Sequence, residues 1–301
     1  MVGPEQLEKL MNMIAPLFAA LFSVLVPNKM WYAVNQPDEI RVDSKDAVTL
    51  VLTDFSGKKL DANESADVEG GKTVDVKKIF PELSNRGTFV LYAVPKGKDL
   101  PDFEGTPLVI EVRGEPNGPN EPEVTKIEPL RYALMDTKQG PITMIFYYDV
   151  APNTVDSFLT LSEQGFYDGL TFHRIVPGFV IQGGDPRGNG TGGPGYNVNA
   201  EFNNRPHEAG VLSMARANDP NSAGSQFFIC LDYTTTKSLD NKYTAFGQVV
   251  DGMNAVKAIA ATPLADANNG TPQTPQVIQK VTVKPVTAKE NPYAQFLHVG
   301  K

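Results

Sequence analysis

Residues 172–185 read Phe-His-Arg-Ile-Val-Pro-Gly-Phe-Val-Ile-Gln-Gly-Gly-Asp. Apolar residues on both sides of a Pro-Gly pair predict two strands that are joined by a tight turn. Arg174 falls on the first strand and Gln182 on the second. Because side chains at facing positions of a hairpin share one surface, we expect this cation and this amide to lie side by side.

The sequence around this hairpin predicts a closed β structure. Alternating patterns at Tyr132–Met135, Ile142–Tyr147 and Val277–Val283 are typical of strands. Apolar residues at helical spacing over 155–162 and 253–260 predict two helices. Many short strands with only two helices favour an antiparallel barrel capped by those helices, because closure leaves no edge strand unpaired.

The first half of the chain has a different pattern. Short apolar runs separated by Gly, Asn, Asp and Pro predict a small β-sandwich-like domain. Its expected strands are Glu39–Val42, Val48–Thr53, Thr73–Val76, Thr88–Val94 and Pro107–Val112. Charge also separates the halves, since residues 1–129 hold 14 Lys and Arg against 21 Asp and Glu, whereas residues 130–301 hold 13 against 14. In a chain of 301 residues we therefore expect two domains with different surfaces.

The segment from Leu7 to Val26 is the most apolar stretch of the chain. Its apolar residues recur every three or four positions, which predicts a helix. Acidic residues near the start are unlike a secretory signal, and Pro16 interrupts any membrane-spanning run. Three interpretations stay open: a helix that packs on its own protein or on a partner, a degenerate signal, and a membrane-surface anchor. The apolarity favours an extracytoplasmic or membrane-associated location over a cytoplasmic one.

Residues 114–123 read Gly-Glu-Pro-Asn-Gly-Pro-Asn-Glu-Pro-Glu. Proline and glycine at this density disrupt both helices and strands, so the run predicts a semi-rigid linker. We expect five parts in the chain. They are an N-terminal helix over 1–28, a β-sandwich-like domain over 29–113, a linker over 114–129, the barrel over 130–285 and a tail over 286–301.

Composition and spacing exclude several classes of protein. The net charge of −8 argues against a nucleic-acid partner. The single cysteine, Cys230, excludes an internal disulfide, and its apolar surroundings predict a buried thiol rather than a nucleophile. Gly188–Gly193 matches the dinucleotide pattern G-x-G-x-x-G, but Pro194 and Gly195 follow where a helix would have to begin. The three histidines are far apart, and no metal or other cofactor is implied.

Five motifs occur in a fixed order, namely FHRIVPGFVIQGGD at 172–185, GTGG at 190–193, GVLSMARA at 210–217, GSQFFI at 224–229 and AFGQVVDGM at 245–253. Together they resemble the cyclophilins, which are peptidyl-prolyl cis-trans isomerases, over about residues 130–285. The resemblance implies an eight-stranded antiparallel barrel capped by two helices, with a shallow proline pocket on its outer face. It also implies that the chain isomerises X-Pro bonds in peptides and folding proteins.

The same resemblance implies which residues form the site. Arg174 matches the catalytic arginine of the family, which would stabilise the twisted amide. The residues that match the pocket walls and the groups that hold the peptide are Phe179, Val180, Gln182, Ala215, Arg216, Phe228, Leu239 and Tyr243. At position 216 the family pairs its backbone with the substrate, so an arginine in place of the usual asparagine leaves that pairing intact.

Two positions depart from the family pattern. Ser238 stands where cyclosporin-sensitive members carry tryptophan, and Tyr243 replaces a histidine, as in bacterial-type members. Serine offers neither indole surface nor an indole N–H, so we expect weak cyclosporin binding.

The expected partners are proline-containing peptides and unfolded protein clients, and a membrane or partner contact through residues 7–26 stays open. The alternative function is a binding module or chaperone that recognises proline segments, with incidental catalysis. A third is a scaffold protein in which the isomerase is an accessory.

Overall fold

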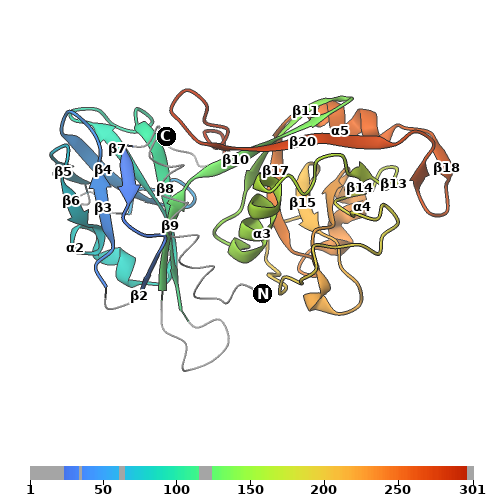
Figure 1. Ribbon diagram of the computed structural model, residues 1–301, viewed down its shortest axis with the longest axis horizontal. Helices are drawn as coiled ribbons and strands as arrows, with labels where there is room; N and C mark the ends of the chain where they lie inside the picture. Colours follow the sequence, from blue (N-terminus) through green and yellow to red (C-terminus); the bar gives the residue numbers. More distant parts are fainter. Residues whose placement is uncertain (1–23, 34–35, 61–64, 115–123, 297–301) are drawn as a thin grey trace. The chain divides into compact units, whose positions relative to one another are not determined.

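The computed structural model describes residues 24–33, 36–60, 65–114 and 124–296. The chain divides into two compact units. One consists of the residues up to 130 together with those from 285 onward, and the other consists of residues 131–284. We call them the N-terminal unit and the barrel unit, and each is described by itself (Figure 1).

The barrel unit is built on one antiparallel sheet. Its strands follow the spatial order β12-β20-β10-β11-β17-β15-β16-β14-β13. In chain order they are β10 (Arg131–Thr137), β11 (Gly140–Phe146), β12 (Thr171–Phe172), β13 (Arg174–Val176), β14 (Val180–Gly183), β15 (Val211–Met214), β16 (Phe227–Cys230), β17 (Ala245–Asp251) and β20 (Gln276–Pro285). A small hairpin of β18 (Leu264–Asp266) and β19 (Thr271–Pro272) stands apart from this sheet.

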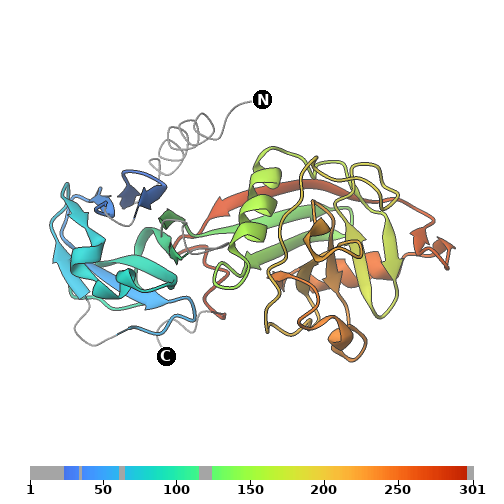
Figure 2. The ribbon, with the colours of Figure 1, turned by 90° about the horizontal axis from the view of Figure 1, so that it is seen from below.

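One interrupted strand closes this sheet into a barrel. β12 and β13 are consecutive in the chain and separated only by His173. β12 pairs with β20 at one end of the spatial order, and β13 pairs with β14 at the other end. Counted as one strand, the two halves give the eight strands that the sequence predicts, and the prediction of a mainly β barrel is confirmed (Figure 2).

The two predicted helices of the barrel unit are also present. They are α3 (Pro152–Glu163) and α5 (Met253–Ala260). α3 buries Phe158, whose ring contacts the rings of Phe146, Phe227 and Phe246 at centroid distances of 5.3 to 5.6 Å. These rings lie on three strands and one helix, so the aromatic cluster fixes α3 to the inside of the sheet. A further short helix, α4 (Tyr233–Thr236), follows β16.

The N-terminal unit has two sheets, as the sequence predicts for a sandwich-like domain. The smaller has the order β1-β3-β6 and the larger the order β2-β9-β8-β7-β4-β5. Buried residues of both sheets, such as Ile40 and Leu108, belong to one core cluster. Their elements are β1 (Leu25–Pro27), β2 (Trp31–Ala33), β3 (Glu39–Val42), β4 (Val48–Asp54), β5 (Ser65–Val68), β6 (Thr73–Asp75), α2 (Val76–Ile79), β7 (Gly87–Pro95), β8 (Glu104–Arg113) and β9 (Val124–Pro129).

Two segments of the N-terminal unit differ from their predictions. A helix is predicted over 1–28, but Leu25–Pro27 lie in β1 and pair with β3. Residues 1–23 of that predicted helix lie outside the described residues. Residues 124–129 were expected to be linker, but they form β9 between β8 and β2. The prediction was wrong because Lys126 and Glu128, whose charges are typical of a solvent-facing linker, are buried in the sheet beside Ile127. No helix in the described part of the chain is long and apolar enough to cross a membrane.

The C-terminal segment is part of the N-terminal unit and not a free tail. The backbone N–H of Val286 donates to the carbonyl of Leu130 at 2.9 Å. Val286 and Tyr293 are fully buried, and the ring of Tyr293 packs edge-on against Phe55 at a centroid distance of 6.3 Å. The pattern of this segment alone did not predict its burial, because its packing partners lie more than 150 residues earlier in the sequence.

We expect Tyr293→Ala to lower the free energy of unfolding of the N-terminal unit by about 3 kcal/mol, because it removes a fully buried ring. The measurement is denaturant unfolding followed by the fluorescence of Trp31. This residue is the only tryptophan of the chain and lies in β2. The control is Tyr196→Ala, which removes an exposed ring of the barrel unit. An unchanged Trp31 transition in Tyr293→Ala would show that the segment does not stabilise this unit.

Candidate functional site

Four strands of the barrel present a row of directly paired residues. From one strand to the next the partners are Arg174 on β13, Gln182 on β14, Phe228 on β16 and Ser213 on β15. Directly opposed residues in an antiparallel sheet share a face. The adjoining row consists of fully buried residues, namely Ile175, Ile181, Ile229 and Leu212. Since successive side chains point to opposite faces, the second row fills the interior and the first row lies on the outer wall.

The side chain of Arg174 is exposed on this wall, and the backbone of its strand is fixed by a hydrogen bond to a neighbouring loop. The N–H of its neighbour Ile175 donates to the carbonyl of Gly270 at 2.7 Å. Gly270 has a φ of +73°, and a Cβ there would stand 2.4 Å from the carbonyl oxygen of Ile175. Only glycine therefore allows the loop between β18 and β19 to support β13 this closely.

The guanidinium of Arg174 is weakly engaged. Its Nη1 donates to Oε1 of Gln182 over 3.4 Å, and no carboxylate among the described residues forms an ion pair with it. Gln182 in turn donates from Nε2 to Oε1 of Gln226 at 3.0 Å, and Gln226 donates to the carbonyl of Gly192 at 2.9 Å. A chain of amides thus leads from the guanidinium to the glycine-rich loop, and it leaves most of the guanidinium donors facing solvent.

Phe228 forms the apolar centre of the row. Its side chain is 5% exposed. The ring of Tyr243 meets it edge-on at a centroid distance of 5.8 Å, and the ring of His207 stacks against it at 6.3 Å with 23° between the planes. Phe228 is therefore held between two rings from different loops, and Val180 lies on the same outer face of the neighbouring strand.

Arg216 stabilises the loops beside Phe228 through cation–π contacts and hydrogen bonds. Its guanidinium lies 4.7 Å from the ring centroid of Tyr243 and 5.6 Å from that of Phe202. Nε and Nη2 donate to the carbonyl of Lys242, and Nη1 donates to the carbonyls of Ala217 and Asn218, at 2.9 to 3.3 Å. The sequence assigned this residue a role through its backbone. The structure adds that its side chain ties two loops together.

The remaining predicted residues lie around the same wall. Phe179 is in the turn between β13 and β14, and its carbonyl accepts the N–H of Leu231. Leu239 ends a 3₁₀ turn, and its carbonyl accepts the N–H of Tyr243. Ala215 donates its N–H to the carbonyl of Gln226. The contacts of Phe179 and Leu239 with a proline ring stay a prediction.

A hollow of about 670 Å³ opens next to the row. Its lining includes Gln182, Gln226, Ala215 and the glycine-rich segment 190–195. The loop keeps its shape through Asp185, whose carboxylate accepts N–H groups from residues 187, 189 and 190. Burial alone would raise the pKa of Asp185, but these hydrogen bonds lower it below its usual value, so the carboxylate stays charged.

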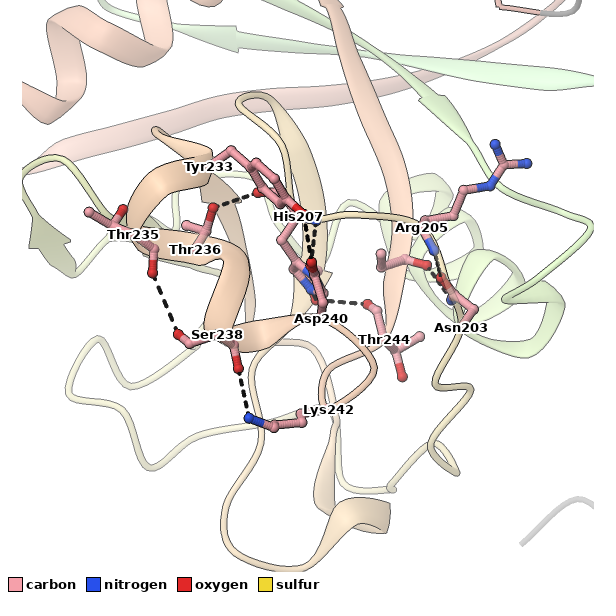
Figure 3. Close-up of polar contacts among 12 residues, drawn as sticks. Asn203, Arg205, His207, Tyr233, Thr235, Thr236, Ser238, Asp240, Lys242 and Thr244 are labelled. Atoms are coloured by element: carbon pink, nitrogen blue, oxygen red, sulfur yellow. Dashed lines mark hydrogen bonds and ion pairs between the residues drawn. The ribbon is translucent and has the colours of Figure 1, made fainter.

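A polar network that the sequence did not predict is centred on His207, whose ring stacks on Phe228. Figure 3 shows His207, Asp240 and Tyr233 of this network. Nδ1 of His207 and its backbone N–H both lie within 3.0 Å of Oδ1 of Asp240, and Nε2 lies 3.0 Å from Oγ of Ser213. The hydroxyl of Tyr233 donates to Oδ2 of Asp240 at 3.0 Å. Burial lowers the pKa of His207, although Asp240 opposes this effect. The only signal for the network was a lone histidine, since its partners are up to 33 residues away.

Cys230 is buried, as predicted, and burial raises the pKa of its thiol to about 12. The thiol is therefore protonated and unreactive at neutral pH. Among the described residues, the positions paired next to Arg174 hold an amide and a phenyl ring and no nucleophile, so the wall combines a charged donor with an apolar ring.

The barrel unit is thus a closed antiparallel β-barrel with a cation, an amide and an enclosed ring side by side on its outer wall. A family model for the cyclophilin type peptidyl-prolyl cis-trans isomerase/CLD matches residues 132–283. This chain therefore belongs to the cyclophilin family and is a peptidyl-prolyl cis-trans isomerase. The family model leaves the N-terminal unit unmatched.

Two relatives found by sequence agree with this assignment. A peptidyl-prolyl cis-trans isomerase of Synechococcus elongatus is 54% identical over 119 residues, which cover 40% of this chain and 80% of that protein. Peptidyl-prolyl cis-trans isomerase B of Bacillus subtilis is 50% identical over 113 residues, which cover 37% of this chain and 77% of that protein. A solved cyclophilin of Cryptosporidium parvum, determined in the presence of the dipeptide Ala-Pro, is 30% identical, with a TM-score of 0.48 and coverage of 52% of this chain and 99% of that one.

We expect Arg216→Ala to lower the free energy of unfolding of the barrel unit by about 1 kcal/mol, because it removes a cation–π brace and several hydrogen bonds to carbonyls. Arg216→Lys should lose most of the same amount, since lysine lacks the planar fork that reaches three carbonyls. The measurement is denaturant unfolding followed by near-ultraviolet circular dichroism. Arg187→Ala, at an exposed position of the same unit, is the control. Wild-type stability in Arg216→Lys would mean that charge alone matters here.

Proposed function

We propose that the outer wall around Arg174 binds X-Pro segments of peptides and folding proteins, and that Arg174 stabilises the twisted amide during isomerisation. The observation that supports this most strongly is the register of the sheet. It puts a weakly engaged guanidinium, an amide and an enclosed phenyl ring on directly paired positions of one face. These are the donor, the holder of the peptide and the apolar surface that the reaction needs.

The reaction needs no nucleophile. Rotation about an X-Pro bond faces a barrier of about 18–20 kcal/mol because twisting the amide destroys its resonance. In the twisted state the proline nitrogen regains a localised lone pair, and the charge on the carbonyl oxygen changes. A fixed donor beside the bond therefore binds the twisted form more strongly than either planar form, which lowers the barrier.

Arg174 is suited to this task by its environment. Its one side-chain hydrogen bond to a described residue is long, so little is lost when the guanidinium turns toward a substrate. Arginine stays charged at every physiological pH and presents its donors in a rigid plane. Each 1.4 kcal/mol of preference for the twisted state gives about a tenfold rate increase, so a few oriented hydrogen bonds account for a large acceleration.

Phe228 and its neighbours supply the apolar surface for the proline ring. We assign Phe228, Val180 and Tyr243 to the walls against the proline ring, together with Phe179 and Leu239. Exclusion of water by these side chains strengthens the field of Arg174, because charges interact more strongly where the local dielectric is low.

The peptide on either side of the bond needs its own partners. Gln182 is held in place by Gln226, so its amide is oriented before the peptide binds. The backbone N–H and carbonyl of Arg216 form no hydrogen bond with another described residue, and so they are open to a peptide in extended conformation. Holding one side of the X-Pro bond while the other side turns is what converts binding into isomerisation.

We expect Arg174→Ala to slow the isomerisation of a prolyl peptide at least tenfold without unfolding the barrel, because the side chain is exposed and makes one long hydrogen bond. The measurement is exchange spectroscopy by NMR on a model peptide. Lys257→Ala, at an exposed position of α5 outside the lining of the hollow, serves as the control for loss of surface charge.

The same spectra give the affinity for the peptide, which separates the two candidate functions. An isomerase should lose rate and keep most of its affinity in Arg174→Ala. A binding module with incidental catalysis should lose both together. An unchanged rate would contradict the role of Arg174.

We expect wild-type protein to bind cyclosporin with micromolar or weaker affinity. Ser238 is exposed, and its hydroxyl makes only a 3.5 Å contact with the carbonyl of Thr235, so the rim has no large apolar group at this position. Ser238→Trp should strengthen binding at least tenfold, as measured by titration calorimetry. Nanomolar binding by the wild type would show that Ser238 does not occupy the rim.

A further inference from the structure

His207 lies directly behind the proposed proline pocket and has no part in the function proposed above. It is fully buried, and its ring stacks on the ring of Phe228. Figure 3 shows it beside Asp240, with Tyr233 and Thr236 on the adjacent helix α4. The carbonyl of His207 accepts the hydroxyl of Thr236, so the backbone is fixed as well as the ring.

The hydrogen bonds around this ring determine where its protons lie. The hydrogen bonds that Asp240 accepts from His207 and Tyr233 lower its pKa, although burial alone would raise it, so the carboxylate is charged and can only accept. Nδ1 of His207 faces this carboxylate at 3.0 Å and must therefore carry a proton. In the neutral ring Nε2 is then an acceptor, and it takes the one hydroxyl proton of Ser213.

Protonation of the ring reverses the second contact. Nε2 then carries a proton and donates it to Oγ of Ser213. The hydroxyl proton of Ser213 becomes free to donate to the carbonyl of Thr244, which lies 3.0 Å from Oγ. The two protonation states of His207 therefore produce two different hydrogen-bond patterns at Ser213, and each pattern satisfies a different acceptor.

Phe228 is next to both His207, which gains the proton, and Ser213, whose hydrogen bonds change. Ser213 is its direct partner across β15 and β16. The imidazole stacks on its ring, so a positive charge on His207 would act on the face of the phenyl group. The other side of Phe228 is held by Tyr243, and a shift of the ring relative to Tyr243 alters the surface that receives a proline.

The ionisable groups that face His207 come from several elements. Asp240 follows the 3₁₀ turn, Tyr233 on α4 binds the same carboxylate, and Cys230 on β16 feels the charge of Asp240. Tyr233 and Cys230 are neutral near pH 6, because the pKa of each is raised. Asp240 stays charged there, so His207 is the group of this cluster that titrates in mild acid.

We propose that His207 is a positioning residue for Phe228, and that its protonation changes the geometry of the proline pocket. The effect on catalysis rests on the function proposed above, whereas the effect on the Phe228 ring does not. Because burial lowers the pKa of His207, the change should occur below the usual midpoint of about 6.5.

The first test uses the wild-type chain and needs no activity. Ring signals of Phe228 and the Cε1–H signal of His207 are followed by NMR between pH 8 and pH 4.5. We expect the signals of Phe228 to shift with the midpoint of His207, and to stay constant over that range in His207→Gln. The matched control is His173→Gln, which removes the other described histidine and should leave the shift intact. Ring signals of Phe228 that do not follow His207 in the wild type would overturn the proposal.

The second test measures isomerisation over the same pH range. At pH 7.5, His207→Gln should raise KM about fivefold and change kcat less than twofold, because it removes a ring that supports the pocket in ground and transition states alike. The wild-type kcat/KM should change with the midpoint of His207, and the variant profile should be flat there. A KM and a pH profile that match those of the wild type would overturn the proposal. If the wild-type chain shows no isomerisation, the proposed function fails, while the NMR titration still decides the role of His207.

Discussion

Closure of the barrel through a strand that breaks at His173 controls the position of the site. Because β12 pairs with β20 and β13 pairs with β14, the register of β13 is fixed from the point where Arg174 begins it. A slip of one residue would turn Arg174 into the interior and Ile175 out to solvent. Burial of Ile175 opposes this slip, because the slip would expose that apolar side chain and bury the charge of Arg174. The hydrophobic core thus determines the chemistry of the outer wall.

Behind that wall, side-chain contacts connect loops that are distant in the sequence. Arg216 holds Tyr243 from one side, and the His207–Asp240 pair supports Phe228 from behind. All three side-chain nitrogens of Arg216 and both ring nitrogens of His207 have hydrogen-bond partners within the barrel unit. The pocket is therefore built before any substrate arrives, and binding does not have to supply the free energy to order it. Arg174 is the exception, because its guanidinium has a single long hydrogen bond to a described residue.

Local patterns predicted the barrel well and the connections poorly. The Pro-Gly turn between apolar runs was sufficient to place Arg174 and Gln182 on facing strands, because register follows from turn and alternation. β9 was missed, since Lys126 and Glu128 are buried by tertiary contacts that no local pattern reports. The pairing of His207 with Asp240 was missed for the same reason, as only the folded barrel joins positions 33 residues apart. The charge and turn residues of a segment predict only its local structure. β9 and the His207–Asp240 pair depend on residues that are distant in the sequence.

The C-terminal segment has a consequence for the order of folding. Residues 131–284 are continuous in sequence, so the barrel unit can complete its sheet as soon as β20 has been synthesised. The N-terminal unit needs Val286 and Tyr293, which are both fully buried and are synthesised after the whole barrel. In most multidomain chains the N-terminal domain folds first during synthesis. Here the first unit in the sequence gains its last contacts, among them the Tyr293 ring on Phe55, only after the barrel has been synthesised. The barrel therefore reaches its native contacts while the unit that precedes it is still incomplete.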